Sequence, residues 1–330
     1  MTDKTLDVVA IGNAIVDVLS RADEAFLASH DMVKGSMQLI DTETAERIYD
    51  AMGPGTEASG GSAANTAAGL ASFGSRVAFV GKVRDDQLGR VFAHDVQSVG
   101  VHYDVPPAPD GPATARCLIF VTRDAQRTMS TYLGASSLIG PDDVDEDLVA
   151  RAKVVFCEGY LWDLPEAKAA LVKGMDVAAR TGGKVAFSLS DSFCVERHRD
   201  EFLDLVRDKV DILFANEAEI CSLYQVDDWD EAASRVAGHC DIACLTRSEH
   251  GSVIVTRDGQ RVEVPPQVLR RVVDTTGAGD LYAAGFLHGY THDRPMAVCG
   301  RLAALAAGEV ISHVGARPQV KLSALESSRL

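Results

Sequence analysis

The chain has 330 residues, of which 46% are hydrophobic and 24% are charged, a composition typical of a soluble globular protein. This length predicts two domains or one large α/β domain, with a core that needs no disulfide or metal. The formal net charge of −16 leaves no basic excess for nucleic acid or an anionic membrane, although a helix N-terminus could still bind a small anion.

The cysteines and the N-terminal segment bear on where the protein works. The seven cysteines are widely spaced, and the closest pair, Cys240 and Cys244, lacks the spacing of a zinc site. We therefore expect buried, reduced thiols and a cytoplasmic location. The segment MTDKTLDVVAIGN carries acids where a signal peptide is basic, and no stretch approaches the roughly 18 apolar residues of a membrane span.

The N-terminal third alternates between apolar runs and helical patterns. The run at 6–11 predicts a buried strand that ends at Gly12, and a second run at 14–19 contains Asp17. Further expected elements are a helix at 42–52 with Asp41 as its N-cap, a closely packed helix within the Gly/Ala-rich stretch 60–74, a strand at 77–80 and a helix at 87–98.

The centre of the chain has a different pattern. Between residues 101 and 133, β-branched residues alternate with polar ones, interrupted by the turn PPAPDGP at 106–112. Such alternation is typical of a sheet with one face toward solvent. We therefore expect these strands, together with the segment 34–40, to form a small lid outside the main sheet.

After residue 141, strands and helices alternate regularly. Repeated β–α units with short apolar strands predict a parallel sheet covered by helices on both faces. The expected strands are 154–157, 184–189, 212–214 and 242–246, followed by a hairpin of 253–256 and 261–264; the expected helices are 165–180, 196–206, 217–224, one after Gly277 and one at 295–313.

The segment DTTGAGDLYAAGFLHG at 274–289 is the most informative for chemistry. The small residues Gly277, Ala278 and Gly279 open a helix and leave N–H groups free at the positive end of its dipole, which is a pocket for a phosphate. Asp280 in the first turn could simply complement this dipole. Alternatively, it could accept a proton from a hydroxyl that attacks phosphorus.

Three motifs resemble one enzyme family. DTTGAGD, the GGSAANTA at 60–67 and the NEAE at 216–219 are similar, in order and spacing, to the signatures of the PfkB, or ribokinase-like, carbohydrate kinases. Within that family, the segments most similar to adenosine kinases are GNAIVD (12–17), RTMSTYLGAS (127–136), EGYL (158–161), SLSDSF (188–193) and VDILFANEAE (210–219).

The resemblance implies a phosphoryl-transfer site. Asp280 would be the catalytic base, and Gly277, Ala278 and Gly279 would form the anion hole for the transferring phosphoryl group. Asn216 and Glu219 would hold Mg²⁺ and its waters near the ATP phosphates. The residues implied around the acceptor are Asp17 on the ribose hydroxyls with Gly61 and Asn65 beside it, Asn13 near the nucleobase, Arg127 along the phosphate path, and Leu133, Tyr160 and Leu161 as apolar walls.

The residues taken alone leave other interpretations open. Asp17 could be a turn or cap aspartate, although a buried carboxylate in an apolar run would suit a vicinal diol. Asn65 could be a surface or capping amide. Asn216 and Glu219 could form an N-cap with a capping-box glutamate, and Arg127 could pair with a surface acid.

One segment of the expected ATP site differs from the family pattern. The family's T-x-G-x-x-G pattern reads TRSEHG at 246–251, so Thr246 and Gly251 are present but Ser248 replaces the middle glycine. The helix at 303–311 should flank the adenine of ATP, or serve only as core packing. Asp274, Thr276 and the stretch 310–315 resemble the place where relatives bind K⁺.

These features predict one ribokinase-like domain over 1–330, a three-layer α/β sandwich with a central, mostly parallel sheet and a β lid from about 13–40 and 101–134. The expected reaction is MgATP-dependent phosphorylation of the 5′-hydroxyl of a nucleoside, with adenosine as first choice and K⁺ as a further cofactor. The alternatives are a kinase for a free sugar such as ribose or a phosphorylated hexose, and a catalytically silent ligand-binding relative. We expect a monomer or homodimer.

Overall fold

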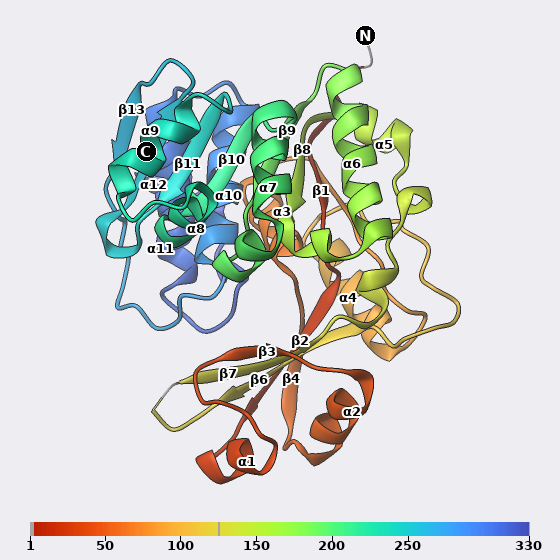
Figure 1. Ribbon diagram of the computed structural model, residues 1–330. Coiled ribbons are helices and arrows are strands. Elements are labelled where there is room, and N and C mark those ends of the chain that lie inside the picture. Colours follow the sequence, from red (N-terminus) through yellow and green to blue (C-terminus); the bar gives the residue numbers. More distant parts are fainter. Residues whose placement is uncertain (1–2, 125, 330) are drawn as a thin grey trace.

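The computed structural model describes residues 3–124 and 126–329. Its larger part is built on an eight-stranded sheet and its smaller part on a five-stranded sheet (Figure 1). The large sheet has the order β13-β12-β11-β10-β9-β8-β1-β5. Its parallel strands are β1 (Leu6–Ile11), β5 (Val77–Val80), β8 (Ala152–Glu158), β9 (Lys184–Ser188), β10 (Ile212–Asn216) and β11 (Ile242–Thr246), and the antiparallel edge is β12 (Ser252–Thr256) and β13 (Arg261–Val264).

Successive residues of these strands feed two separate cores. In β1, Val8 and Ala10 belong to one core, and Val9 and Ile11 belong to the other, as the alternation of side chains along a strand requires. The first core is covered by α3 (Ser62–Phe73), α4 (Gln87–Ser98), α10 (Ala278–Thr291), α11 (Met296–Val310) and α12 (Leu322–Arg329). The second is covered by α5 (Glu146–Ala150), α6 (Pro165–Arg180), α7 (Ser192–Asp208), α8 (Glu217–Tyr224) and α9 (Trp229–Ala237). The expected three-layer sandwich is confirmed.

The lid is a five-stranded sheet of order β3-β7-β6-β2-β4, with two short helices on one face (Figure 1). Its elements are β2 (Ile15–Arg21), α1 (Glu24–Ser29), β3 (Met37–Leu39), α2 (Thr42–Ala51), β4 (Gly55–Gly60), β6 (Ala115–Val121) and β7 (Arg127–Tyr132). The expected lid ranges need two corrections. They omitted β4, and within 101–114 the chain forms only isolated bridges, at His102 and Ala108.

Strand register shows which side chains lie on each face of the lid sheet. Asp17 of β2 lies beside Cys117 of β6, which lies beside Thr131 of β7, so these three side chains share one face. Phe120 belongs to the opposite face, where its ring lies 5.1 Å from that of Phe26 in α1. The helices therefore cover the outer face of the lid, and Asp17 is directed toward the large domain.

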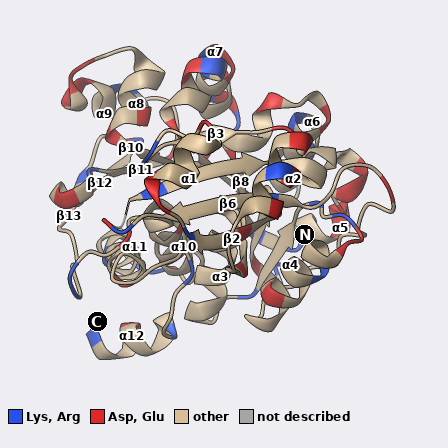
Figure 2. Cartoon of the chain, turned by 90° about the horizontal axis from the view of Figure 1, so that it is seen from below, with Lys and Arg blue, Asp and Glu red and all other residues tan. Residues whose placement is uncertain are grey.

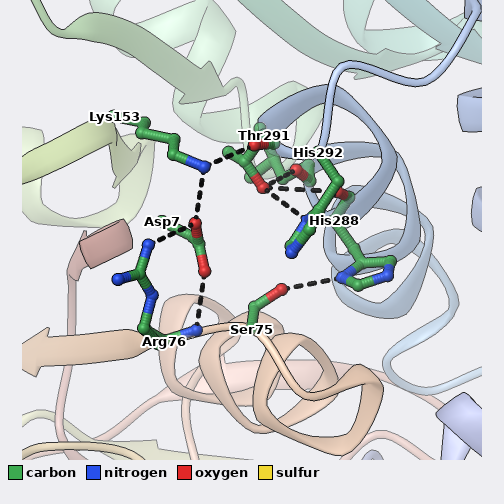
Figure 3. A network of polar contacts seen from close by, with 8 residues as sticks. Asp7, Ser75, Arg76, Lys153, His288, Thr291 and His292 are labelled. Carbon is green, nitrogen blue, oxygen red and sulfur yellow. Dashed lines mark hydrogen bonds and ion pairs between the residues drawn. The ribbon is translucent and has the colours of Figure 1, made fainter. Parts of the chain in front are cut away.

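A polar network anchors the C-terminal end of α10 to the start of the sheet (Figure 3). The Asp7 carboxylate accepts a hydrogen bond from the Arg76 backbone at 2.9 Å and forms an ion pair with Lys153 at 2.9 Å. Lys153 also donates to the carbonyl oxygen of Thr291 at 2.7 Å. His288, on the same helix, lies 2.8 Å from the Ser75 hydroxyl, and burial lowers the pKa of this histidine to about 4.

Several further sequence predictions can be compared with the structure. The bounds of α6, α8, β11 and β13 agree with the predicted ranges, whereas α1, α9 and α12 were not predicted. Within the described ranges there are also four 3₁₀ helices: Gly134–Leu138, Pro141–Asp143, Gly159–Asp163 and Ser248–His250. All seven cysteines are free thiols, and six are buried, as expected. Among the described residues, every helix is too short or too polar to span a bilayer.

Charges of both signs are mixed on the surface. On the lid-side face in Figure 2, Lys and Arg residues lie among Asp and Glu residues along outer helices such as α6 and α7, rather than in one basic stripe.

Candidate functional site

The carboxyl ends of three parallel strands meet the N-terminus of α10 at one cavity of about 410 Å³. Ser188, Asn216 and Thr246 are the last residues of β9, β10 and β11, and all three line it. The opposite wall is formed by residues 275–280. Ligands of open α/β sheets bind at this edge, because the strands end there and helices begin.

The start of α10 has the geometry of an anion site. Gly277 is the N-cap, with a φ of 78°, and a Cβ there would meet Ala316 at 2.8 Å, so the position requires glycine. Gly279 faces open space. The N–H of Ala278 donates to the carbonyl oxygen of Thr275 at 3.2 Å. An incoming anion would therefore compete with this carbonyl oxygen for the same N–H. The helix dipole places positive potential at this mouth.

Asp280 is directed into the cavity and is held there by α3. Its Oδ1 accepts a hydrogen bond from Ser62 Oγ at 2.7 Å, and its Oδ2 accepts one from Asn65 Nδ2 at 3.0 Å. Burial raises the pKa of Asp280, and these two bonds partly offset that rise. A carboxylate that only complemented the dipole would need neither partner.

Asp17 lies inside β2, and not in a turn or cap, so that alternative is wrong. Burial raises the pKa of Asp17 to about 6, while the guanidinium groups of Arg317 and Arg127 lower it and Asp280 raises it further. The lid therefore places a second carboxylate within the electrostatic reach of Asp280.

Asn13 and Gly61 form the junction between the lid and the large domain. Asn13 Nδ2 donates to Oε1 of Glu158 at 2.8 Å, and Asn13 Oδ1 accepts from the Ser136 hydroxyl at 2.9 Å. Gly61 has a φ of 90°, and a Cβ there would collide with the carbonyl oxygen of Asn13. Most of the Asn13 amide is thus occupied within the protein.

No role was predicted for Glu158 from the sequence, although this residue lies within the EGYL segment. It is fully buried at the end of β8 and accepts two bonds from Asn13 and one from the Ala63 backbone at 2.7 Å. Burial raises its pKa to about 7 despite these bonds. The sequence signals were its place in the EGYL segment and an acid at the end of an apolar strand.

Arg127 and Asn65 have partners inside the protein. The alternatives that Arg127 pairs with a surface acid and that Asn65 is a surface or capping amide are therefore wrong. Arg127 Nη1 lies 2.7 Å from Oδ2 of Asp274 and donates to Thr276 Oγ1 at 2.8 Å. The acid is buried rather than at the surface. Asn65 is buried and bonds to Asp280 and to Arg317, a residue that the sequence analysis did not single out.

Asn216 and Glu219 form the capping box at the start of α8. Asn216 Oδ1 accepts from the Glu219 N–H at 2.9 Å, and Glu219 Oε2 accepts from the Asn216 N–H at 3.0 Å. Both residues also line the cavity, so the structural and the functional interpretation coexist. Burial raises the pKa of Glu219 to about 7.

A second cavity of about 310 Å³ lies beside the first, between the β11–β12 turn and α11. Thr246, Ser248 and Gly251 line it, and Ser248 adopts the left-handed φ of 48° that the family glycine would suit. The helix α11 contributes Ala304, Ala307 and Gly308. The two cavities share the residues at the start of α10, namely Thr275, Ala278, Gly279 and Tyr282 as well as Thr246.

The three expected apolar walls lie in different places. Tyr160 lines the first cavity with Asn216 and Glu219, and its hydroxyl donates to the carbonyl oxygen of Ser190 at 3.2 Å. Leu161 is buried in the core under α6 and α7, so it is not a wall residue. Leu133 is half-buried just before the 3₁₀ helix at Gly134–Leu138.

Comparison with known proteins gives a consistent result. A family model described as pfkB family carbohydrate kinase matches residues 32–322. The chain is 52% identical to the solved adenosine kinase of Sinorhizobium meliloti, with a TM-score of 0.92 and coverage of 98% and 99% of the two chains. It is 51% identical to a probable sugar kinase of Rhizobium etli, with a TM-score of 0.93 and coverage of 99% of both chains.

A more distant relative is the 5-dehydro-2-deoxygluconokinase of Geobacillus kaustophilus, which is 28% identical over 77% of this chain and 78% of its own. The family model covers most of the chain, and the two solved structures share both its architecture and half of its residues. The protein therefore belongs to the PfkB family of carbohydrate kinases.

Proposed function

We propose that this protein transfers the γ-phosphoryl group of ATP to the 5′-hydroxyl of a nucleoside, with adenosine as the substrate. The observation that carries the proposal is the position of Asp280. Its carboxylate stands at the anion-binding mouth of α10, is held by two donors from α3, and is within the field of Asp17 in the lid. The likeness to the Sinorhizobium meliloti adenosine kinase supports adenosine as the acceptor.

In the proposed step, Asp280 accepts the proton of the 5′-hydroxyl while the oxygen attacks the γ-phosphorus. The new O–P bond forms as the bond from phosphorus to the β–γ bridging oxygen breaks, giving AMP and ADP. The N-terminal N–H groups of α10 stabilise the negative charge on the transferring group. Because the protein forms no covalent intermediate, its contribution is positioning, charge stabilisation and exclusion of water.

The two adjoining cavities suit the two halves of ATP. The lining of the cavity beside α11 includes three alanines, three glycines, Val268, Val272 and Ile311 and suits the adenine, whereas the polar cavity at the start of α10 suits the phosphates. Asn216 and Glu219 would hold the Mg²⁺ that accompanies ATP, through water molecules. This assignment fits the chemistry, because Mg²⁺ keeps several waters and takes few protein ligands. Among the described residues, no group of three or more His, Cys, Asp or Glu side chains forms a metal cage.

A K⁺ site near Asp274 and Thr276 stays a prediction. The Asp274 carboxylate already accepts from the Thr276 N–H and hydroxyl, from the Gly315 N–H and from Arg127. A K⁺ ion would therefore be bound through the carbonyl oxygens of the 310–315 segment, with Asp274 as a support. Turnover measured in K⁺ and in an equal concentration of choline tests this.

Acceptor specificity is tested by a coupled ADP-release screen across nucleosides and free sugars. We expect adenosine to give the largest kcat/KM, and mass spectrometry to find AMP as the product. A larger value for ribose or another sugar would favour the second candidate, a sugar kinase, which the Rhizobium etli structure and the gluconokinase relative support. No turnover with any acceptor would leave the third alternative, a silent relative.

A further inference from the structure

Arg317 reaches the proposed catalytic carboxylate through one intermediate side chain. Its Nε donates to Oδ1 of Asn65 at 2.8 Å, and Nδ2 of Asn65 donates to Oδ2 of Asp280 at 3.0 Å. The preceding residue, Ala316, packs against Gly277 at the start of α10. The segment after α11 is therefore fixed to the same helix end whose carboxylate its arginine approaches.

The direction of these hydrogen bonds decides which atom Asn65 presents to Asp280. A guanidinium has donors only, so the Asn65 atom that faces Arg317 must be the amide oxygen. The NH₂ group then faces Asp280, where it favours the ionised carboxylate over the protonated acid. Without Arg317, the amide could rotate by half a turn and present its oxygen, which would favour a protonated acid that cannot serve as a base.

The other surroundings of Asp280 make such an orientation necessary. Burial raises its pKa, and two further acids lie within its electrostatic reach: Asp17, whose pKa is raised to about 6, and Glu158, whose pKa is raised to about 7. Burial lowers the pKa of Arg317 to about 10, which still leaves it charged at neutral pH. The titratable and charged groups whose fields couple to Asp280 are Asp17 from the lid, Glu158 at the end of β8, Tyr160 in the 3₁₀ helix that follows, and Arg317; the lid residue Arg127 acts on Asp17.

The guanidinium group of Arg317 does not have hydrogen-bond partners for all of its donors. Its Nη2 is buried and, within the described residues, makes no hydrogen bond. A buried donor without a partner costs stability, so packing alone does not explain the position of this side chain.

We propose that Arg317 is a positioning residue for phosphoryl transfer: it fixes the Asn65 amide so that its NH₂ group holds Asp280 as an anion, ready to accept the acceptor's proton. This inference rests on the proposed function, in which Asp280 is the base.

The test is the dependence of kcat on pH with saturating adenosine and MgATP. In Arg317→Met, which keeps most of the length but removes the donors, we expect the midpoint of the acidic limb to rise by about one pH unit, with activity recovering at high pH. Asn65→Ala should move the midpoint in the same direction. The double variant should move it by less than the sum of the two single shifts, because part of the Arg317 effect passes through Asn65 and part is its direct field on Asp280. Arg317→Lys, which retains charge and donors, should restore most of the wild-type profile.

Arg301→Met is the matched control, because Arg301 lies on α11 and is exposed. It should leave the profile unchanged. If kcat of the Arg317→Met enzyme is lower than that of the wild type by one constant factor at every pH, Arg317 has a structural role and the inference is overturned. If circular dichroism shows that Arg317→Met does not fold, Asn65→Ala decides, and an unmoved midpoint there overturns it. Wild-type protein without turnover on adenosine would instead reject the proposed function.

Discussion

The two ends of helix α10 differ in whether their polar groups have partners within the protein or face a cavity. At the C-terminal end, His288 and Thr291 have partners in Ser75 and Lys153, and the network closes on itself (Figure 3). At the N-terminal end, Gly279 faces open space, and Asp280 points into a cavity. One end is completed by the protein, and the other is left for a ligand to complete.

This difference explains how one helix serves both stability and chemistry. The closed end fixes α10 against β1 and β8, so the open end can present polar groups to the cavity without moving to satisfy them. Preorganised groups of this kind cost stability locally and lower the barrier for transfer. Substitutions at the open end should therefore change turnover, whereas substitutions at the closed end should change stability.

The largest expected effect is at the open end. Asp280→Asn removes the proton acceptor but keeps the size of the side chain, so kcat should fall by about 10²–10⁴-fold, with little change in melting temperature. Initial rates of AMP formation measure this. Asp293→Asn, exposed just beyond the far end of the same helix, is the control and should leave the rate unchanged. An Asp280→Asn enzyme as fast as the wild type would contradict the proposed base.

Asp17→Asn should affect binding more than turnover. Loss of charge-assisted hydrogen bonds to the acceptor's hydroxyls should raise KM for adenosine by about 10–100-fold. Because the pKa of Asp17 is raised to about 6, the wild-type KM should also rise as the pH falls below about 6. Asp50→Asn, on the exposed outer side of α2, is the control. An unchanged KM at pH values well above 6 would remove Asp17 from the acceptor site.

The closed end should show its effect in stability as a function of pH. Burial, then the field of His292, lowers the pKa of His288 to about 4 from its usual 6.5. Between these values the unfolded state binds more protons than the folded one, so the free energy of unfolding falls as the pH falls, by up to about 3 kcal/mol at pH 4. His288→Gln should reduce the loss of melting temperature on acidification through this window.

Exposed His250 provides the control for this pH experiment. His250→Gln should retain the wild-type slope of melting temperature against pH. The assignment to His288 would be wrong if both variants lost stability with pH as steeply as the wild type.

The smallest expected effect concerns the second cavity. Ser248 holds a left-handed φ of 48°, which costs a residue with a side chain about 1 kcal/mol, so Ser248→Gly should raise the free energy of unfolding by roughly 0.5 kcal/mol after its own chain entropy. Urea unfolding measures this. Ser248→Ala keeps the strained backbone and should give no gain; a gain there would show that the hydroxyl, and not the backbone, is responsible.

Much of the large domain could be predicted from the sequence, because short apolar strands and amphipathic helices are local patterns. The lid was harder. Its strand β4 reads GTEASG, which has neither β-branched alternation nor hydrophobic length, and it becomes a strand only by pairing with β2. Conversely, the alternating residues at 101–114 have no ladder to join beyond two isolated bridges.

In the candidate site too, some features could be predicted from the sequence and others could not. Asp280 and Asn216 lie in short motifs, so the sequence pointed to them directly. Asn65 was also predicted, from the GGSAANTA motif, but its bond to Asp280 was not. The contact of Asp280 with Ser62, 218 positions away, and that of Asn65 with Arg317, 252 positions away, join segments that are distant in the sequence. No local pattern identifies residues that meet only in the folded chain.

The cysteines have a practical consequence for following this enzyme at work. Cys221, on the helix that begins at the capping box of Asn216 and Glu219, is the one thiol with partial exposure in the described chain. Burial raises the pKa of Cys221 and of the other thiols alike, but the other thiols are also shielded from solvent, so they react more slowly with electrophiles. A maleimide fluorophore should therefore label the native enzyme at a single place, on the helix whose first turn lines the proposed ATP phosphate cavity, without any cysteine being removed first.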